Sequence, residues 1–265
     1  MNIFRVLLSR ILNLILRNTP VGVLNFVEEK VQINLGKGSG ADTTEEEAEA
    51  IAQIIKSLNI LEVNALDVGA NIGNWTAAIL RVLPDSKIVA FEPSAKAYLQ
   101  LSERFRNSPR VECINKALGN KDSVAVLYAD KSASGLGSLT KRRVDHFGID
   151  FSFQEDIEIE RLDSWIRSQP ANFRPNILKM DVEGHELEVL EGAIESLKYI
   201  QVVQFEFGGS NIDTRTFFQD FWYLFSNLDF EIYRITPSGK VRINLYRESD
   251  ETFRPTNYIA VRKEK

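Results

Sequence analysis

Short apolar runs alternate with segments of helical periodicity along most of this chain. Each run has four to six residues and is mostly apolar, which is typical of strands buried in a parallel sheet. The runs that predict such strands are 63–68, 87–91, 111–115, 177–180 and 202–207. This alternation predicts an α/β fold with a doubly wound, mostly parallel sheet, in which ligands bind at the carboxyl ends of the strands.

The segments between these strands predict helices. Helical periodicity covers 44–58, 94–106 and 186–197. The first of these helices is preceded by a good start signal, because Thr44 and Glu47 form a capping-box pattern.

Two insertions depart from this alternation. Residues 124–128 and 157–159 predict extra strands, and the flexible stretch 132–138 lies between them. We interpret that stretch equally as a plain surface loop or as a lid or binding loop. Near the end of the chain, 231–235 and 258–261 predict an antiparallel pair that closes the sheet.

Residues 1–40 predict an extension to the main domain at 41–265. An amphipathic helix comes first, and the alternation at 31–35 predicts a short strand. The glycine-rich break at 36–40 is the best candidate boundary.

The predicted N-terminal helix allows two interpretations. Residues 1–16 are rich in Ile, Leu, Val and Phe, and the charges up to position 17 are Arg5, Arg10 and Arg17. The apolar run is too short to span a bilayer, which needs about 20 residues. The helix either docks on the protein's own core or a second subunit, which would make a homo-oligomer, or lies on an anionic membrane.

Composition and charge narrow the classes of function. The chain has 265 residues, 44% hydrophobic and 26% charged, with a net charge of −5. These values suit one large globular α/β domain with extra segments. The basic patch at 141–143 is interpreted as a solvated loop, so we expect no nucleic-acid partner. The single cysteine, Cys113, cannot form an internal disulfide, which fits a cytoplasmic protein, with peripheral contact at the inner membrane face left open.

A glycine-containing turn follows the first strand of the main domain. The sequence reads D-V-G-A-N-I-G-N from Asp67 to Asn74, and a helix follows. Gly69 and Gly73 bracket a turn that passes close to a ligand, where a Cβ would clash. The amides at the start of the helix can hold a carboxylate, such as the one on the methionine tail of S-adenosylmethionine.

A second turn follows the next strand at Phe91-Glu92-Pro93. An acid at the end of this strand can bind ribose hydroxyls, as in dinucleotide sites. The first turn lacks the close second glycine of G-x-G-x-x-G, so the pair of turns favours S-adenosylmethionine over a dinucleotide. A turn that serves packing alone, with Glu92 solvated, is the alternative.

Acidic residues gather at two further strand ends. Asp181 and Glu183 follow the strand at 177–180, and Glu206 ends the next strand. If these strands are neighbours, three carboxylates face one crevice. Such a cluster takes up a proton, binds a cation or shares substrate hydroxyls and amides. Each outcome suits polyol binding or base catalysis, and a divalent metal is the less favoured alternative.

His185 and Lys179 complete the candidate catalytic set. His185 lies at a helix N-terminus, where a neutral imidazole could accept a proton, although an exposed or capping role is favoured. Lys179 would support the acids.

These segments resemble the FkbM family of S-adenosylmethionine-dependent methyltransferases. The matching stretches are L-D-V-G-A-N-I-G-N-W-T from Leu66, F-E-P from Phe91, N-K-A-L-G from Asn115, L-D-S-W from Leu162 and L-K-M-D-V-E-G-H-E from Leu178. The resemblance implies a Rossmann-like class I fold with a seven-stranded sheet. It also implies O-methylation, commonly of sugar hydroxyls in surface glycans or of natural products.

The resemblance and the two turns together give a list of candidate residues. For the cofactor they are Asp67, Gly69, Asn71, Gly73, Asn74, Glu92, Pro93 and Asn115. For the reacting end they are Asp181, Glu183, His185, Glu206 and Lys179, with Asp181 or Glu183 as the base, and no metal ligand is assigned. The expected partner is a small-molecule or glycan acceptor.

Three alternatives stay open. A methyltransferase could act on a carboxylate or amine of a small metabolite or lipid, and a carboxylate acceptor needs no base. A cofactor-binding module without turnover is the alternative from another class. A dehydrogenase is a distant third.

Overall fold

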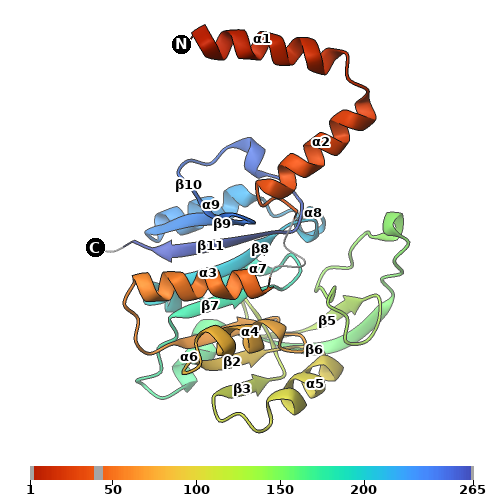
Figure 1. The fold of residues 1–265 in the computed structure, drawn as a ribbon. Coiled ribbons are helices and arrows are strands. Elements are labelled where there is room, and N and C mark those ends of the chain that lie inside the picture. The colour runs from red at the N-terminus through yellow and green to blue at the C-terminus, as the bar shows by residue number, and fades with distance from the viewer. Residues whose placement is uncertain (1–2, 39–43, 264–265) are drawn as a thin grey trace.

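The computed structural model describes residues 3–38 and 44–263, and its centre is an eight-stranded sheet (Figure 1). The strand order is β10-β9-β11-β8-β7-β1-β2-β3. The pairs β3–β2, β2–β1, β1–β7 and β7–β8 are parallel, whereas β11 runs antiparallel to both β8 and β9. A second sheet of three strands has the order β4-β6-β5.

The strands and helices have the following bounds. The large sheet contains β1 (Asn64–Val68), β2 (Lys87–Phe91), β3 (Val111–Ile114), β7 (Ile177–Met180), β8 (Val202–Phe207), β9 (Phe230–Thr236), β10 (Gly239–Ile243) and β11 (Thr256–Arg262). The small sheet contains β4 (Ala117–Gly119), β5 (Ser123–Ala129) and β6 (Phe153–Arg161). The helices are α1 (Ile3–Arg17), α2 (Val21–Asn34), α3 (Thr44–Ser57), α4 (Asn74–Val82), α5 (Ala95–Phe105), α6 (Leu162–Ser168), α7 (Glu186–Glu191), α8 (Ser210–Thr214) and α9 (Phe218–Asn227). Single turns of 3₁₀-helix lie at η2 (Asp145–Phe147), η3 (Ser196–Lys198) and η4 (Glu248–Asp250).

Alternation along the strands divides the core between the two faces of the large sheet. In β1, Leu66 and Val68 pack in a cluster with side chains of α6, α7 and α9. Ala65 points to the other face and packs with side chains of α3 and α4. Because successive side chains of a strand point to opposite faces, a short apolar run fills both cores. The predicted doubly wound, mostly parallel sheet is confirmed.

Aromatic rings dominate the core under α9. Phe205 of β8 is fully buried, and its ring stacks on those of Phe221, Phe225 and Tyr258 with centroid distances of 4.9, 5.2 and 5.4 Å. Tyr258 belongs to β11, so the stack joins two neighbouring strands to the helix that covers them. This cluster fixes β8, whose end carries Glu206.

Several predicted elements match the structure and others do not. The strands expected at 87–91, 177–180 and 202–207 have these bounds, and the expected closing pair is β9 with β11. The sheet has eight strands rather than seven, because β10 adds an antiparallel edge. Helix 186–197 is divided into α7 and η3.

The divided helix has a physical cause in the L-D-S-W segment. The buried carboxylate of Asp163 accepts hydrogen bonds from the backbone N–H groups of Glu195 and Ser196 at 3.1 and 2.9 Å. A side-chain acceptor at these amides starts a new turn. The segment therefore has a structural role, which the motif did not reveal.

The strand predicted at 31–35 is wrong, because α2 continues to Asn34. Five alternating residues are too few to separate a strand from the end of a helix. The predicted break at 36–40 is only partly described, and Gly36 and Lys37 are buried in it rather than flexible. Thr44 is the first residue of α3, so the cap before it lies outside the described residues.

The two N-terminal helices extend away from the rest of the chain (Figure 1). Every described side chain of α1 is exposed, and α2 has no buried residue. The prediction that the N-terminal helix docks on the protein's own core is therefore wrong for the described side chains. None of the described helices combines the length and apolarity that crossing a membrane requires.

Removing the central ring of the aromatic stack should destabilise the fold. We expect Phe205→Ala to lower the free energy of unfolding by about 3–5 kcal/mol, because a cavity replaces a fully buried ring. Tyr223→Ala is the control, since Tyr223 is an exposed ring on α9, the helix that covers the stack, and its effect should stay within about 0.5 kcal/mol. Urea denaturation followed by circular dichroism measures both. Equal losses in the two variants would contradict this account of the core.

Candidate active site

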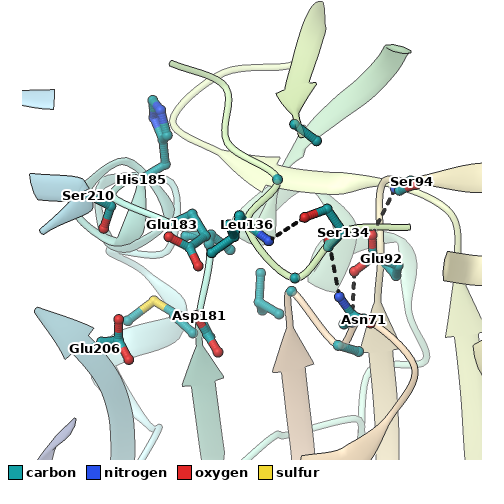
Figure 2. Close-up of a pocket in the computed structure, with 18 of the residues that line it drawn as sticks. Asn71, Glu92, Ser94, Ser134, Leu136, Asp181, Glu183, His185, Glu206 and Ser210 are labelled. Carbon is teal, nitrogen blue, oxygen red and sulfur yellow. Dashed lines mark hydrogen bonds between the residues drawn. The ribbon is translucent and has the colours of Figure 1, made fainter. Parts of the chain in front are cut away.

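A cavity of about 770 Å³ opens at the carboxyl ends of β1, β2, β7 and β8. The glycine turn and Glu92 form one side, and Asp181, Glu183 and Glu206 form the other (Figure 2). The loop after β5 and the start of α3 complete the wall. Parallel strands place the turns that follow them at one edge, so segments more than a hundred residues apart in sequence share this cavity.

Glu92 joins the two predicted turns. Its carboxylate accepts a hydrogen bond from the N–H of Asn71 at 2.8 Å and another from the N–H of Ser94 at 2.9 Å. Burial raises the pKa of Glu92 to about 7, although these two bonds oppose the shift. The acid is therefore held in one place on the cavity wall, so the alternative of a solvated Glu92 is wrong.

Asp67 lies beneath the glycine turn, outside the residues that line the cavity. It is fully buried, and its carboxylate is 3.0 Å from Lys179 Nζ and accepts a hydrogen bond from Thr76 at 2.7 Å. Lys179 Nζ also donates to the carbonyl of Gly69 at 3.1 Å. Burial opposes the charge of Lys179, but Asp67 and Asp181 raise its pKa above the usual value. Asp67 thus holds the turn, and the predicted direct contact with a cofactor is not supported.

Gly69 is required by the protein itself. It has φ +74°, and a Cβ there would lie 1.9 Å from the carbonyl oxygen of Asp181. The sequence predicts that a Cβ here would clash with a ligand, whereas the structure shows that it would clash with the turn after β7. Gly73 packs against Leu101 and Phe105 of α5 and does not line the cavity.

Of three further predicted cofactor residues, two line the cavity and one does not. Asn74 and Pro93 line the cavity. Asn115 does not, and its amide donates to the carbonyls of Glu92 and Pro93 at 2.8 and 2.9 Å. Asn115 therefore positions the second turn from behind.

The acidic residues meet as predicted, because β7 and β8 are neighbours. Asp181, Glu183 and Glu206 all line the cavity, whereas the side chain of Asp181 is about half exposed at 49%. Burial and then the charge of Asp181 raise the pKa of Glu183 to about 8. Burial also raises the pKa of Glu206 well above its usual range, and Asp181 and Glu183 add to the shift. Neighbouring acids of one type thus have different tendencies to ionise.

Arg142 pairs with this cluster. Its guanidinium lies 2.6 Å from Glu183 and 3.6 Å from Asp213, and its side chain is only 12% exposed. The interpretation of 141–143 as a solvated loop is therefore wrong for Arg142. Sequence gave no pointer to this residue, since its partners are 41 and 71 positions away.

The stretch 132–138 lines the cavity and contacts both of its sides. The carbonyl of Ser134 accepts a hydrogen bond from the Asn71 side chain at 3.2 Å (Figure 2). The hydroxyl of Ser138 donates to the carbonyl of Glu183 at 2.8 Å. Of the two interpretations of this stretch, the structure favours the binding loop.

His185 lines the cavity but turns away from the acids (Figure 2). Its Nε2 is 3.0 Å from the hydroxyl of Thr140, and its Nδ1 is 3.3 Å from a carboxylate oxygen of Glu188. Both ring nitrogens have partners, so this geometry does not support the predicted role as a base. Within the described ranges, no group of three or more His, Cys, Asp or Glu side chains is arranged to hold a metal ion.

Sequence reasoning missed a buried network of hydrogen-bonded side chains beside the acids. Trp75 Nε1 donates to Gln204 at 2.9 Å, and Gln204 and Asn257 each donate to Glu47 at 2.6 Å. Glu47, Trp75 and Asn257 line the cavity. The available signal was a polar Gln204 in the middle of an apolar strand, because buried polar groups need partners.

A family model of the methyltransferase FkbM domain matches residues 67–232, more than half of the chain. The chain belongs to this family. The predicted FkbM membership is confirmed, and the doubly wound sheet described above has the predicted Rossmann-like arrangement.

Three curated relatives are similar to this chain. Methyltransferase 1 of Beauveria bassiana is 28% identical over 141 residues, which cover 48% of this chain and 57% of that protein. The 2-O-methyltransferase NoeI of Sinorhizobium fredii is 22% identical over 60% of this chain and 69% of its own. The hexuronic acid methyltransferase AglP of Haloferax volcanii is 29% identical over 52% of each. The chain thus spans little more than half the length of two of these relatives.

The buried acids should make the folded chain less stable as the pH rises. The pKa of Glu186 is raised to about 7 by burial, so the folded state holds its proton more tightly than the unfolded state, whose value is near 4.5. The stabilisation is complete below the unfolded value and is lost as the pH rises through the folded value. Glu186→Gln cannot ionise, so its free energy of unfolding should fall less between about pH 5 and pH 8, by about 1–3 kcal/mol.

Denaturation titrations at several pH values measure this difference. The matched control is Glu49→Gln, because Glu49 is exposed on α3 and should leave the pH dependence of the parent unchanged. A Glu186→Gln variant with the same slope as the parent would contradict the assignment.

Proposed function

We propose that this protein is an S-adenosylmethionine-dependent O-methyltransferase that acts on a hydroxyl group of a sugar-containing acceptor. The observation that carries the proposal is that one cavity contains two sites with different chemistry. A backbone-bound acid lies at the end of β2, and a cluster of acids lies at the ends of β7 and β8. The end with Glu92, called the nucleoside end below, suits the ribose of a nucleoside. The end with the acidic cluster suits a polyol.

The residues at the first end fit S-adenosylmethionine. Glu92 is fixed on the wall with lone pairs left for ribose hydroxyls, and the start of α4 at Asn74 offers amides for a carboxylate. A volume of about 770 Å³ is within the usual range of ligand pockets, about 300–1,000 Å³, and leaves room for an acceptor. When bound, the cofactor would supply an electrophilic methyl group.

At the second end, one acid would accept the proton of the acceptor and another would donate a hydrogen bond to it. An alcohol is a weak nucleophile at neutral pH and needs a base within hydrogen-bond reach. Asp181 is the best candidate, because its carboxylate is half exposed to the cavity, whereas Glu183 is held by Arg142. Glu206, whose pKa is raised, would remain protonated and donate a hydrogen bond to the acceptor.

The charge of this end favours a hydroxyl over a carboxylate acceptor. A carboxylate placed beside Asp181 would bring two like charges together at the wall of a partly enclosed cavity, which is costly. An amine acceptor meets no such penalty and is the alternative within the same reaction class. The names of NoeI and AglP, a 2-O-methyltransferase and a hexuronic acid methyltransferase, support a sugar as the acceptor.

Changing the base should abolish transfer without weakening cofactor binding. We expect Asp181→Asn to lower the rate of label transfer from S-adenosylmethionine into a glycan extract of the source cells by about 10²-fold or more. Glu206→Gln is the matched comparison, because an amide also donates a hydrogen bond, and it should lose less than about tenfold. Full activity in Asp181→Asn would contradict a hydroxyl acceptor that needs this base and would favour a carboxylate.

Changing the acid of the nucleoside end should instead weaken binding. We expect Glu92→Gln to raise the dissociation constant of S-adenosylhomocysteine by about tenfold or more, because charge-assisted hydrogen bonds are lost. Isothermal titration calorimetry measures this effect, and Glu112→Gln on the exposed side of β3 is the control. Unchanged affinity in Glu92→Gln would remove the basis of the proposed cofactor site. Tight binding by the parent with no transfer to any glycan, lipid or small-molecule extract would favour a binding module without turnover.

A further inference from the structure

The α1 helix separates apolar and basic residues around its axis. At 100° per residue, Arg5, Arg10 and Arg17 fall in one sector together with Ser9 and Asn13. The opposite sector holds leucine, isoleucine and phenylalanine almost without interruption. Helices with a wide apolar face and arginine on the polar face are typical of segments that lie in a membrane interface.

The apolar face of α1 is not covered by the described residues of the chain. Leu12, Leu14 and Ile15 of this face have exposed fractions of 46, 68 and 57%. Large exposed apolar patches on a folded chain mark surfaces that bind a partner or a membrane. In Figure 1, α1 is the element farthest from the sheet, so a flat surface could reach it without obstruction.

The charge of α1 selects the kind of partner. Residues 1–17 contain three arginines and no acid, although the net charge of the whole chain is −5. Anionic lipid headgroups complement such a helix, and the rest of the chain would not be drawn to them. A second copy of α1 carries the same positive charges, so pairing two of these helices would leave their arginines without complementary charges.

The base of α2 is fastened to the main domain, so the arm formed by α1 and α2 has a fixed origin. The carbonyl of Leu35 accepts a hydrogen bond from Arg234 Nε at 2.7 Å, and Lys37 Nζ donates to the carbonyl of Ser249. Gly36 lies so close to β9 that a Cβ would be 2.0 Å from the carbonyl oxygen of Ile235. Thr44, only eight residues after Gly36, already lines the cavity.

We propose that α1 binds the surface of an anionic lipid bilayer, with its apolar face in the interface and its arginines toward the headgroups. The fastened base of α2 then ties the main domain, which contains the cavity, to that surface. The proposal does not depend on the reaction that the cavity catalyses.

Vesicle flotation of the full chain tests this proposal. We expect the parent to float with phosphatidylcholine vesicles that contain about 30% phosphatidylglycerol, and much less with pure phosphatidylcholine. Leu14→Glu/Ile15→Glu should abolish flotation. Arg10→Gln/Arg17→Gln should weaken binding to the anionic vesicles by about thirtyfold, because each basic residue near the surface contributes about 1 kcal/mol and about 1.4 kcal/mol is a factor of ten in affinity.

Matched controls separate this surface from general effects of charge. Leu61→Glu/Leu245→Glu adds the same charge at two exposed leucines of the main domain, and Arg106→Gln/Arg167→Gln removes two exposed arginines there. Both control variants should float like the parent, and all variants should keep its melting temperature. Flotation that persists in Leu14→Glu/Ile15→Glu would overturn the proposal. So would a parent that does not float but sediments as a dimer, if these two substitutions make it a monomer.

Discussion

The buried ion pair between Asp67 and Lys179 is the interaction on which the cavity depends. The two residues are direct neighbours across the β1–β7 ladder, so the register of the sheet brings their side chains together. A buried charge without its partner is costly, and the pair therefore fixes both strands in one register. Lys179 extends the effect to the glycine turn through the carbonyl of Gly69. The pair therefore shapes the glycine-turn side of the cavity, although only Lys179 of the two lines it.

At the acidic end of the cavity, the surroundings of each carboxylate determine its properties. Asp181, Glu183 and Glu206 lie at one sheet edge because β7 and β8 are adjacent, but their surroundings differ. Arg142 neutralises Glu183, burial favours the protonated form of Glu206, and solvent reaches Asp181. One type of side chain thus occupies three different environments, and the proposed roles of Asp181 and Glu206 rest on that difference. The tertiary structure creates these environments, since the three residues are chemically almost the same.

The sequence was sufficient for features that depend on local pattern. The bounds of β2, β7 and β8 follow from apolar runs, and the meeting of Glu92 with Asn71 follows from two turns at adjacent strand ends. It was insufficient where a role depends on distant partners. Asp67 and Asn115 belong to recognisable motifs, yet they support the turns from behind. Arg142 belongs to no motif, and only the folded chain brings it to Glu183. The strand predicted at 31–35 failed for the opposite reason, because a local pattern there was too short to decide.

The hydrogen-bonded network around Glu47 links the wall of the cavity to α3, the first helix of the main domain. Glu47 accepts from Gln204 of β8 and from Asn257 of β11, so one carboxylate from α3 holds the ends of two strands. Gln204 also accepts a hydrogen bond from Trp75 of α4, so α3 and α4 both belong to the same network. Buried polar groups lose much free energy when one partner is removed, so this network ties α3 to the strand that ends at the acidic side of the cavity. Helix α3 therefore shares one hydrogen-bonded network with β8, the strand that carries Glu206.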